Sequence, residues 1–113
     1  MELINELKSL MDDLVYSIKR LRGNGTALAE AERDYKIVLA QECLRLKDEG
    51  MAIGLITLIC YGIPEVAEAR FKRDSAEAVY KANYEAIQSI KLQMRIIENQ
   101  IQREYANTGV GNL

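Results

Sequence analysis

The apolar positions in the second half of the chain repeat every seven residues. The repeat consists of five residues separated alternately by three and four positions: Ile87, Ile90, Met94, Ile97 and Ile101. This spacing places them in one narrow stripe along a helix, which is typical of a seam between paired helices. After Pro64, a residue favoured in the first turn of a helix, neither glycine nor proline interrupts the run to 105. The pattern predicts one helix over 64–105, with the stripe as the seam of an oligomer.

Two more helices are predicted before it. Residues 2–22 carry a stripe of leucines at helical spacing, Leu3, Leu7, Leu10, Leu14 and Leu21, with Ile4, Met11 and Ile18 alongside. Gly23-Asn24-Gly25 is predicted to end this helix, and Thr26 to cap a second helix over 27–49. Gly50 follows that second helix, and glycine readily takes the left-handed conformation at a helix C-terminus. We therefore expect a chain reversal after Gly50.

Residues 51–63 contain no charged side chain. A membrane-spanning helix needs about 20 such residues, so this segment is too short to be one. We expect a short helix over 54–61 that ends at Gly62 and is buried beneath the longer helices. A segment this apolar has to be covered by protein, either from the same chain or from another subunit.

Composition agrees with an all-α fold. The chain has 113 residues, of which one is proline, one is phenylalanine and none is tryptophan. It is rich in the residues that favour helices. We expect a single all-α domain over 1–106, a helical hairpin or bundle with a long C-terminal helix, assembled into a coiled-coil-like homo-oligomer. The tail, residues 107–113, contains Gly and Asn and is expected to be flexible.

Net charge and cysteine content limit the expected partners and the expected cellular location. The net charge of −2 gives no overall attraction to nucleic acid or to an anionic membrane. Cys43 and Cys60 lie in apolar surroundings, and the first residues lack the pattern of a secretory signal. We expect two reduced, buried thiols and a location in the cytoplasm.

The residues that most often carry catalysis are missing. The chain has no histidine, so it lacks the commonest general base and the commonest transition-metal ligand. Carboxylates alternate with basic residues at helical spacing, as in Glu77 and Lys81, which indicates solvated helix faces. We expect no enzyme, metal or cofactor. A helix-turn-helix centred on Gly62 is a weaker alternative, since it puts Leu58 where a small residue is needed and Glu68 at an apolar position.

Two polar residues interrupt the stripe of the long helix when the repeat is extended backwards. Arg73 and Asn83 fall at seam positions, where they either set the register of helix pairing or form a polar pocket. A third interpretation is that the seam ends near Tyr80 and leaves Arg73 exposed. In the second case Ala69 and Ala76 would leave the hollow. The ligand-binding set would be Arg70, Arg73, Tyr80, Asn83 and Tyr84. Guanidinium groups pair with phosphate and tyrosines stack on bases, so this set suits a small anionic nucleotide.

Several surface motifs resemble a group of small early-region proteins from phages and prophages of Gram-positive bacteria. They are residues 46–51 (LKDEGM), 67–74 (AEARFKRD), Ala78, 80–82 (YKA) and 98–104 (ENQIQRE). The resemblance covers about residues 28–105. The group is largely of unassigned function, so no functional residue can be carried over. The resemblance implies a bacterial host cell, and two jobs of small early phage proteins: blocking a host defence factor, or assisting DNA replication or recombination.

These observations favour a non-enzymatic binding protein that occupies a partner, for which a host anti-phage defence factor is the leading hypothesis. The first alternative is sequestration of a small nucleotide signal at a helix interface. The second is an accessory DNA-binding role in phage replication or recombination. The expected partners are other copies of the chain, together with a host protein or a nucleotide. Neither nucleic acid nor a membrane is the favoured partner.

Overall fold

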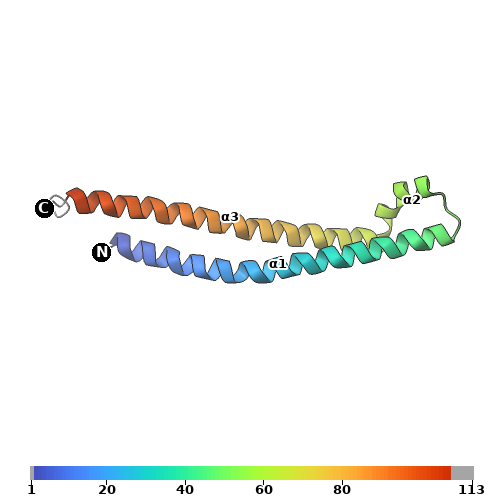
Figure 1. The fold of residues 1–113 in the computed structure, drawn as a ribbon, viewed down its shortest axis with the longest axis horizontal. Helices are drawn as coiled ribbons and strands as arrows, with labels where there is room; N and C mark the ends of the chain where they lie inside the picture. The colour runs from blue at the N-terminus through green and yellow to red at the C-terminus, as the bar shows by residue number, and fades with distance from the viewer. Residues whose placement is uncertain (1, 108–113) are drawn as a thin grey trace. The chain divides into compact units, whose positions relative to one another are not determined.

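A computed structural model describes residues 2–107, and these residues form helices joined by short connections. The elements are α1 (Glu2–Asp48), α2 (Ile53–Ile59), the short 3₁₀ helix η1 (Cys60–Gly62) and α3 (Pro64–Asn107) (Figure 1). The prediction of an all-α hairpin with a long C-terminal helix and a short connecting helix is confirmed. The predicted flexible tail lies outside the described residues, apart from Asn107, which ends α3.

The start of α3 follows from the chemistry of proline. The helix begins at Pro64, and one turn later the N–H of Ala67 donates to the Ile63 carbonyl at 2.9 Å. Proline has no N–H to satisfy, and its fixed φ suits the first turn. The predicted bounds of 64–105 therefore agree closely with the observed helix.

The predicted break at Gly23-Asn24-Gly25 is wrong, because α1 continues through it without interruption. Among the described residues only Gly50 has a positive φ, so neither Gly23 nor Gly25 makes a turn. Glycine inside a helix costs about 1 kcal/mol relative to alanine, which packing along a long helix readily offsets. Gly25 lies against the Tyr80 ring of α3, since a Cβ at Gly25 would be 3.4 Å from that ring.

The end of α1 agrees with the prediction. Gly50 has a φ of 89°, and its N–H donates to the Lys47 carbonyl at 2.9 Å. The N–H of Met51 donates to the Leu46 carbonyl at 3.1 Å, which completes the hydrogen-bond pattern of a Schellman cap. Glycine at this position lets the chain leave α1 and enter α2.

Packing groups the chain into two units, and each unit combines a segment of α1 with a segment of α3. Unit 1 contains residues 2–22 and 82–107 of the described chain, and unit 2 contains residues 23–81. Within each unit the two long-helix segments run side by side in opposite directions (Figure 1). The prediction of a single domain over 1–106 stays a prediction.

The core of unit 2 consists of two small clusters. Tyr35, Val66 and Ala69 form the first, and Leu46, Ile56 and Cys60 form the second. Partly buried side chains of Leu39 and Ile63 pack against both clusters. Val66 is fully buried, which places the tightest packing next to the start of α3.

Unit 1 shows what the seam of α3 contacts. Ile87 is buried, and Ile90, Met94, Ile97 and Ile101 are partly buried. The Asn83 side-chain amide donates to the Ser17 carbonyl of α1 at 3.1 Å, which fixes the pairing of the two segments. The stripe predicted as an oligomer seam therefore faces α1 of the same chain. The leucine stripe of residues 2–22 has the same seven-residue repeat. The chain reversal after α1 places this stripe beside the stripe of α3 within the same chain.

Candidate functional site

Three of the five predicted pocket residues contact α1: Arg73 and Tyr80 in unit 2, and Asn83 in unit 1. The Arg73 guanidinium lies 4.6 Å from the centre of the Tyr35 ring and donates to Asp74 Oδ1 from Nε and Nη2, at 3.0 and 2.7 Å. This hydrogen bonding to Asp74 raises the pKa of Arg73 above its ordinary value, so the guanidinium keeps its charge. Arg73 sits partly exposed at the edge of the seam, with its charge compensated locally.

The other members of the predicted set have separate surroundings. The Arg70 guanidinium lies 5.5 Å from the centre of the Tyr61 ring, and the Tyr80 ring lies against Gly25. Asn83 bonds to α1 as described above, and Tyr84 is half exposed. Arg70, Arg73 and Tyr80 belong to unit 2, whereas Asn83 and Tyr84 belong to unit 1. Their role in holding a nucleotide stays a prediction.

A hollow does lie beside Ala69, but its rim is acidic. It measures about 480 Å³, and Ala27, Ala31 and Ala69 supply the small side chains that leave the space. Four carboxylates and one lysine line it as well: Glu30, Asp34, Glu65, Glu68 and Lys72. A surplus of carboxylates repels phosphate, so the charge of this hollow disfavours an anionic ligand.

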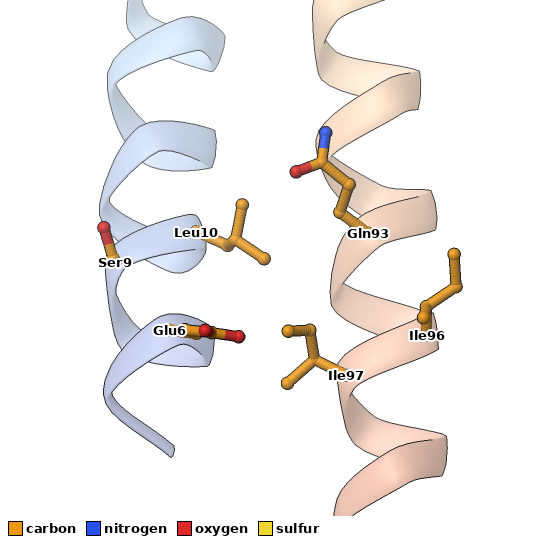
Figure 2. A pocket seen from close by; sticks show the side chains of 6 residues that line it. All are labelled: Glu6, Ser9, Leu10, Gln93, Ile96 and Ile97. Carbon is orange, nitrogen blue, oxygen red and sulfur yellow. The ribbon is translucent and has the colours of Figure 1, made fainter. Parts of the chain in front are cut away.

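A second hollow lies in unit 1, between α1 and α3 (Figure 2). It measures about 350 Å³ and is lined by Glu6, Ser9, Leu10, Gln93, Ile96 and Ile97. Leu10 and Ile97 point toward each other across the space between the helices, and Glu6 lies beside them. No cation lines this hollow, so it also lacks the charge that a nucleotide requires. The hollow arises because the side chains of the two paired helices only partly fill the space between them.

The cysteines are packed together in the core of unit 2. Cys60 is buried, and the partly buried Cys43 packs against its cluster. Burial, followed by the neighbouring Cys60, raises the pKa of the Cys43 thiol. A thiol with a raised pKa is a poor nucleophile, because the reactive form is the thiolate. Among the described residues, no group of three or more potential ligands is placed to hold a metal ion.

The connecting segment differs most from expectation, because only one face of it is buried. Ile56 and Cys60 face the core, where they pack with Leu46. Five large apolar side chains on the same segment are at least 39% exposed, and we call them the apolar cap: Ile53, Leu55, Leu58, Ile59 and Tyr61. A helix of seven residues with apolar side chains all round can cover only one side against α1 and α3. The prediction that this helix is buried is therefore wrong for most of its surface.

The segment that carries the apolar cap is fixed by contacts within the chain. Leu58 and Ile53 protrude most, with 80% and 72% of their surface exposed. Thr57 donates its hydroxyl to the Ile53 carbonyl at 3.0 Å, so this polar side chain is satisfied within α2. Arg70 of α3 covers part of the Tyr61 ring. The lack of charge in 51–63 is the sequence signal that could have identified this surface, since such a segment need not be covered by its own chain.

No protein-family model, curated protein or solved structure matches this chain. None of the helices in residues 2–107 combines the length and apolar character needed to cross a membrane.

Proposed function

We propose that this chain is a non-enzymatic binding protein that occupies a partner protein through the apolar cap. The observation that carries the proposal is the exposure of Leu58 and Ile53 on a segment without charge. Exposed apolar patches of this kind mark interaction surfaces. The resemblance to small early phage proteins supports a host anti-phage defence factor as the partner.

The size of the apolar cap favours a partner with an apolar groove. A stable interface buries about 800 Å² on each side, which is more than a seven-residue helix supplies by itself. Binding energy in such interfaces is concentrated in a few anchors that fill pockets. Leu58 and Ile53 are suited to this role, because the packing of Ile56 and Cys60 behind them holds the segment in place. The partner's groove then supplies the rest of the contact area.

The test is whether the chain protects phages in bacteria that carry defence systems. We expect the wild-type chain to restore phage plating on a strain whose defence it blocks, and the purified defence protein to bind it. Leu58→Glu places a charge at the most exposed position of the apolar cap and is expected to abolish both effects. Leu92→Glu is the matched control, because Leu92 is 54% exposed on α3 and lies in the other unit.

Two results would overturn the proposal. The first is full protection by Leu58→Glu at wild-type expression and helix content, which would remove the apolar cap from the binding surface. The second is a wild-type chain that leaves plating unchanged on every strain of a broad defence panel. If Leu58→Glu changes the mass of the free protein instead, the apolar cap binds a second copy.

A further inference from the structure

The two cysteines of the chain meet in the core of unit 2, although they come from different elements. Cys43 belongs to α1 and Cys60 begins η1, and both pack in the cluster that contains Leu46 and Ile56. The Cys43 thiol is hydrogen-bonded to the Cys60 side chain, and the Cys60 thiol donates to the Thr57 carbonyl at 3.9 Å. The two sulfurs are therefore neighbours in the folded chain, although the residues are 17 positions apart in the sequence.

The surroundings of this thiol pair favour a bond between the sulfurs. The cluster that holds the pair is apolar, and it includes the partly buried side chains of Leu39, Met51 and Ile63. A thiol is a weak hydrogen-bond donor, so its S–H group gains little in such a site. A disulfide removes both S–H groups and leaves only apolar atoms in the cluster, which avoids the cost of burying a donor.

The two thiols differ in their access to solvent. Cys43 is partly buried, whereas Cys60 is 3% exposed, so a dissolved reagent reaches Cys43 first. Cys60 then lies beside the modified sulfur, in position to displace the reagent. We infer that Cys43 and Cys60 form a reversible disulfide, with a low-molecular-weight disulfide of the glutathione type as the oxidant. This inference is independent of the proposed function, because it concerns the free chain.

The reaction consists of two thiol–disulfide exchanges. The Cys43 thiolate attacks one sulfur of the reagent disulfide, and the other half of the reagent leaves as a thiolate. The Cys60 thiolate then attacks the Cys43 sulfur and expels the second half. Two electrons pass from the protein to the reagent, and the two thiol protons end on the two released thiols. The raised pKa of Cys43 makes the first exchange slow, whereas the adjacent Cys60 makes the second fast.

The disulfide would join the two ends of the segment that carries most of the apolar cap. Residues 43–60 include the end of α1, the reversal at Gly50 and the whole of α2. Within unit 2, α2 and η1 lie alongside the end of α1 (Figure 1). A cross-link restricts the opened segment more than the packed one, so local opening becomes rarer. The thiol–disulfide balance of the surroundings would thereby set the rigidity of this segment.

The test treats the whole reduced chain with oxidised glutathione and follows its intact mass after acid quenching. The native protein is expected to lose two hydrogen atoms with little glutathione adduct, and peptide mapping should place the bond between Cys43 and Cys60. In concentrated urea, packing no longer holds the thiols together. The share of glutathione adduct should then be at least about tenfold larger, because closure loses its proximity advantage. The oxidised chain should also unfold at a higher urea concentration than the reduced chain.

Two variants test the order of the exchanges. Cys60→Ala should stop with one glutathione on Cys43, because the displacing thiol is absent. Cys43→Ala should remain largely unmodified over the same time, because Cys60 is buried. Circular dichroism checks that both variants keep their helix content. The comparison of the native and the urea-unfolded wild-type chain needs no substitution, so it decides the question even where a variant fails to fold.

Hydrogen exchange of residues 51–63 measures the effect on the connecting segment. Exchange should be at least about tenfold slower in the oxidised chain, because opening must occur with both ends joined. Unchanged exchange would show that the bond does not stiffen the segment. The disulfide itself is refuted by an equal share of adduct in native and unfolded chains, by a bond between two chains, or by oxidation that lowers the urea midpoint.

Discussion

Replacing Gly23 by alanine tests the continuity of α1. In the structure Gly23 is helical, with no positive φ, and no atom lies within 4 Å of the Cβ that alanine would add. The substitution therefore removes the helix penalty of glycine, about 0.8–1 kcal/mol, without a packing cost. We expect Gly23→Ala to raise the free energy of unfolding by about 1 kcal/mol and Tm by about 3–6 °C. Thermal and urea unfolding, followed by circular dichroism at the helix band, measure both quantities.

The same substitution at Gly50 is the matched control. Gly50 has a φ of 89°, which costs a residue with a Cβ about 1–2 kcal/mol, so Gly50→Ala should lower stability. Gly25→Ala should gain about as much as Gly23→Ala, because its Cβ would meet the Tyr80 ring at 3.4 Å, an ordinary van der Waals contact. If Gly23→Ala lowered stability as Gly50→Ala does, Gly23 would have to be in a turn. The reasoning for a continuous α1 would then be refuted.

Three further outcomes are expected. Val66→Ala should cost about 2–3 kcal/mol, because two methyl groups leave a fully buried site and a cavity remains; Val79→Ala, at a half-exposed position, should cost less than about 0.5 kcal/mol in the same urea titration. Asn83→Ala removes the 3.1 Å hydrogen bond to the Ser17 carbonyl and should cost about 1 kcal/mol, whereas an unchanged urea midpoint would show that the bond does not stabilise the pairing. Cys43 should be alkylated by iodoacetamide at neutral pH more slowly than a free thiol and faster as pH rises, because its pKa is raised; mass spectrometry follows the reaction, and a rate equal to that of free cysteine would contradict it.

The continuity of α1 was open to prediction from the sequence. The seam positions Leu14, Ser17, Leu21, Asn24 and Leu28 keep their alternating separations of three and four straight through the glycines. A true break between two helices normally shifts this phase, because the turn residues do not follow the helical period. Two glycines within three residues are a strong local signal for a turn, and here the long-range pairing with α3 overrode it.

The candidate site was likewise only partly predictable from the sequence. The seven-residue repeat places Arg73 and Asn83 at seam positions, and both lie at the pairing of α1 and α3. The repeat does not predict which residues they contact, since Tyr35 lies 38 positions before Arg73, and Ser17 lies 66 before Asn83. Likewise, the uncharged run 51–63 was evident, but the exposure of Leu58 depends on how much of α2 the long helices can cover.

The sequence by itself determined the all-α class, the limits of α3, the chain reversal at Gly50 and the two heptad stripes. These features depend on interactions within one or two helical turns, so residue type and spacing suffice to specify them. Only the tertiary structure decided that the stripe of α3 packs on α1 of the same chain and that the apolar cap faces outward. A heptad stripe specifies that a partner helix is needed and leaves its identity open, because the same apolar surface is buried equally well by the chain itself or by another copy.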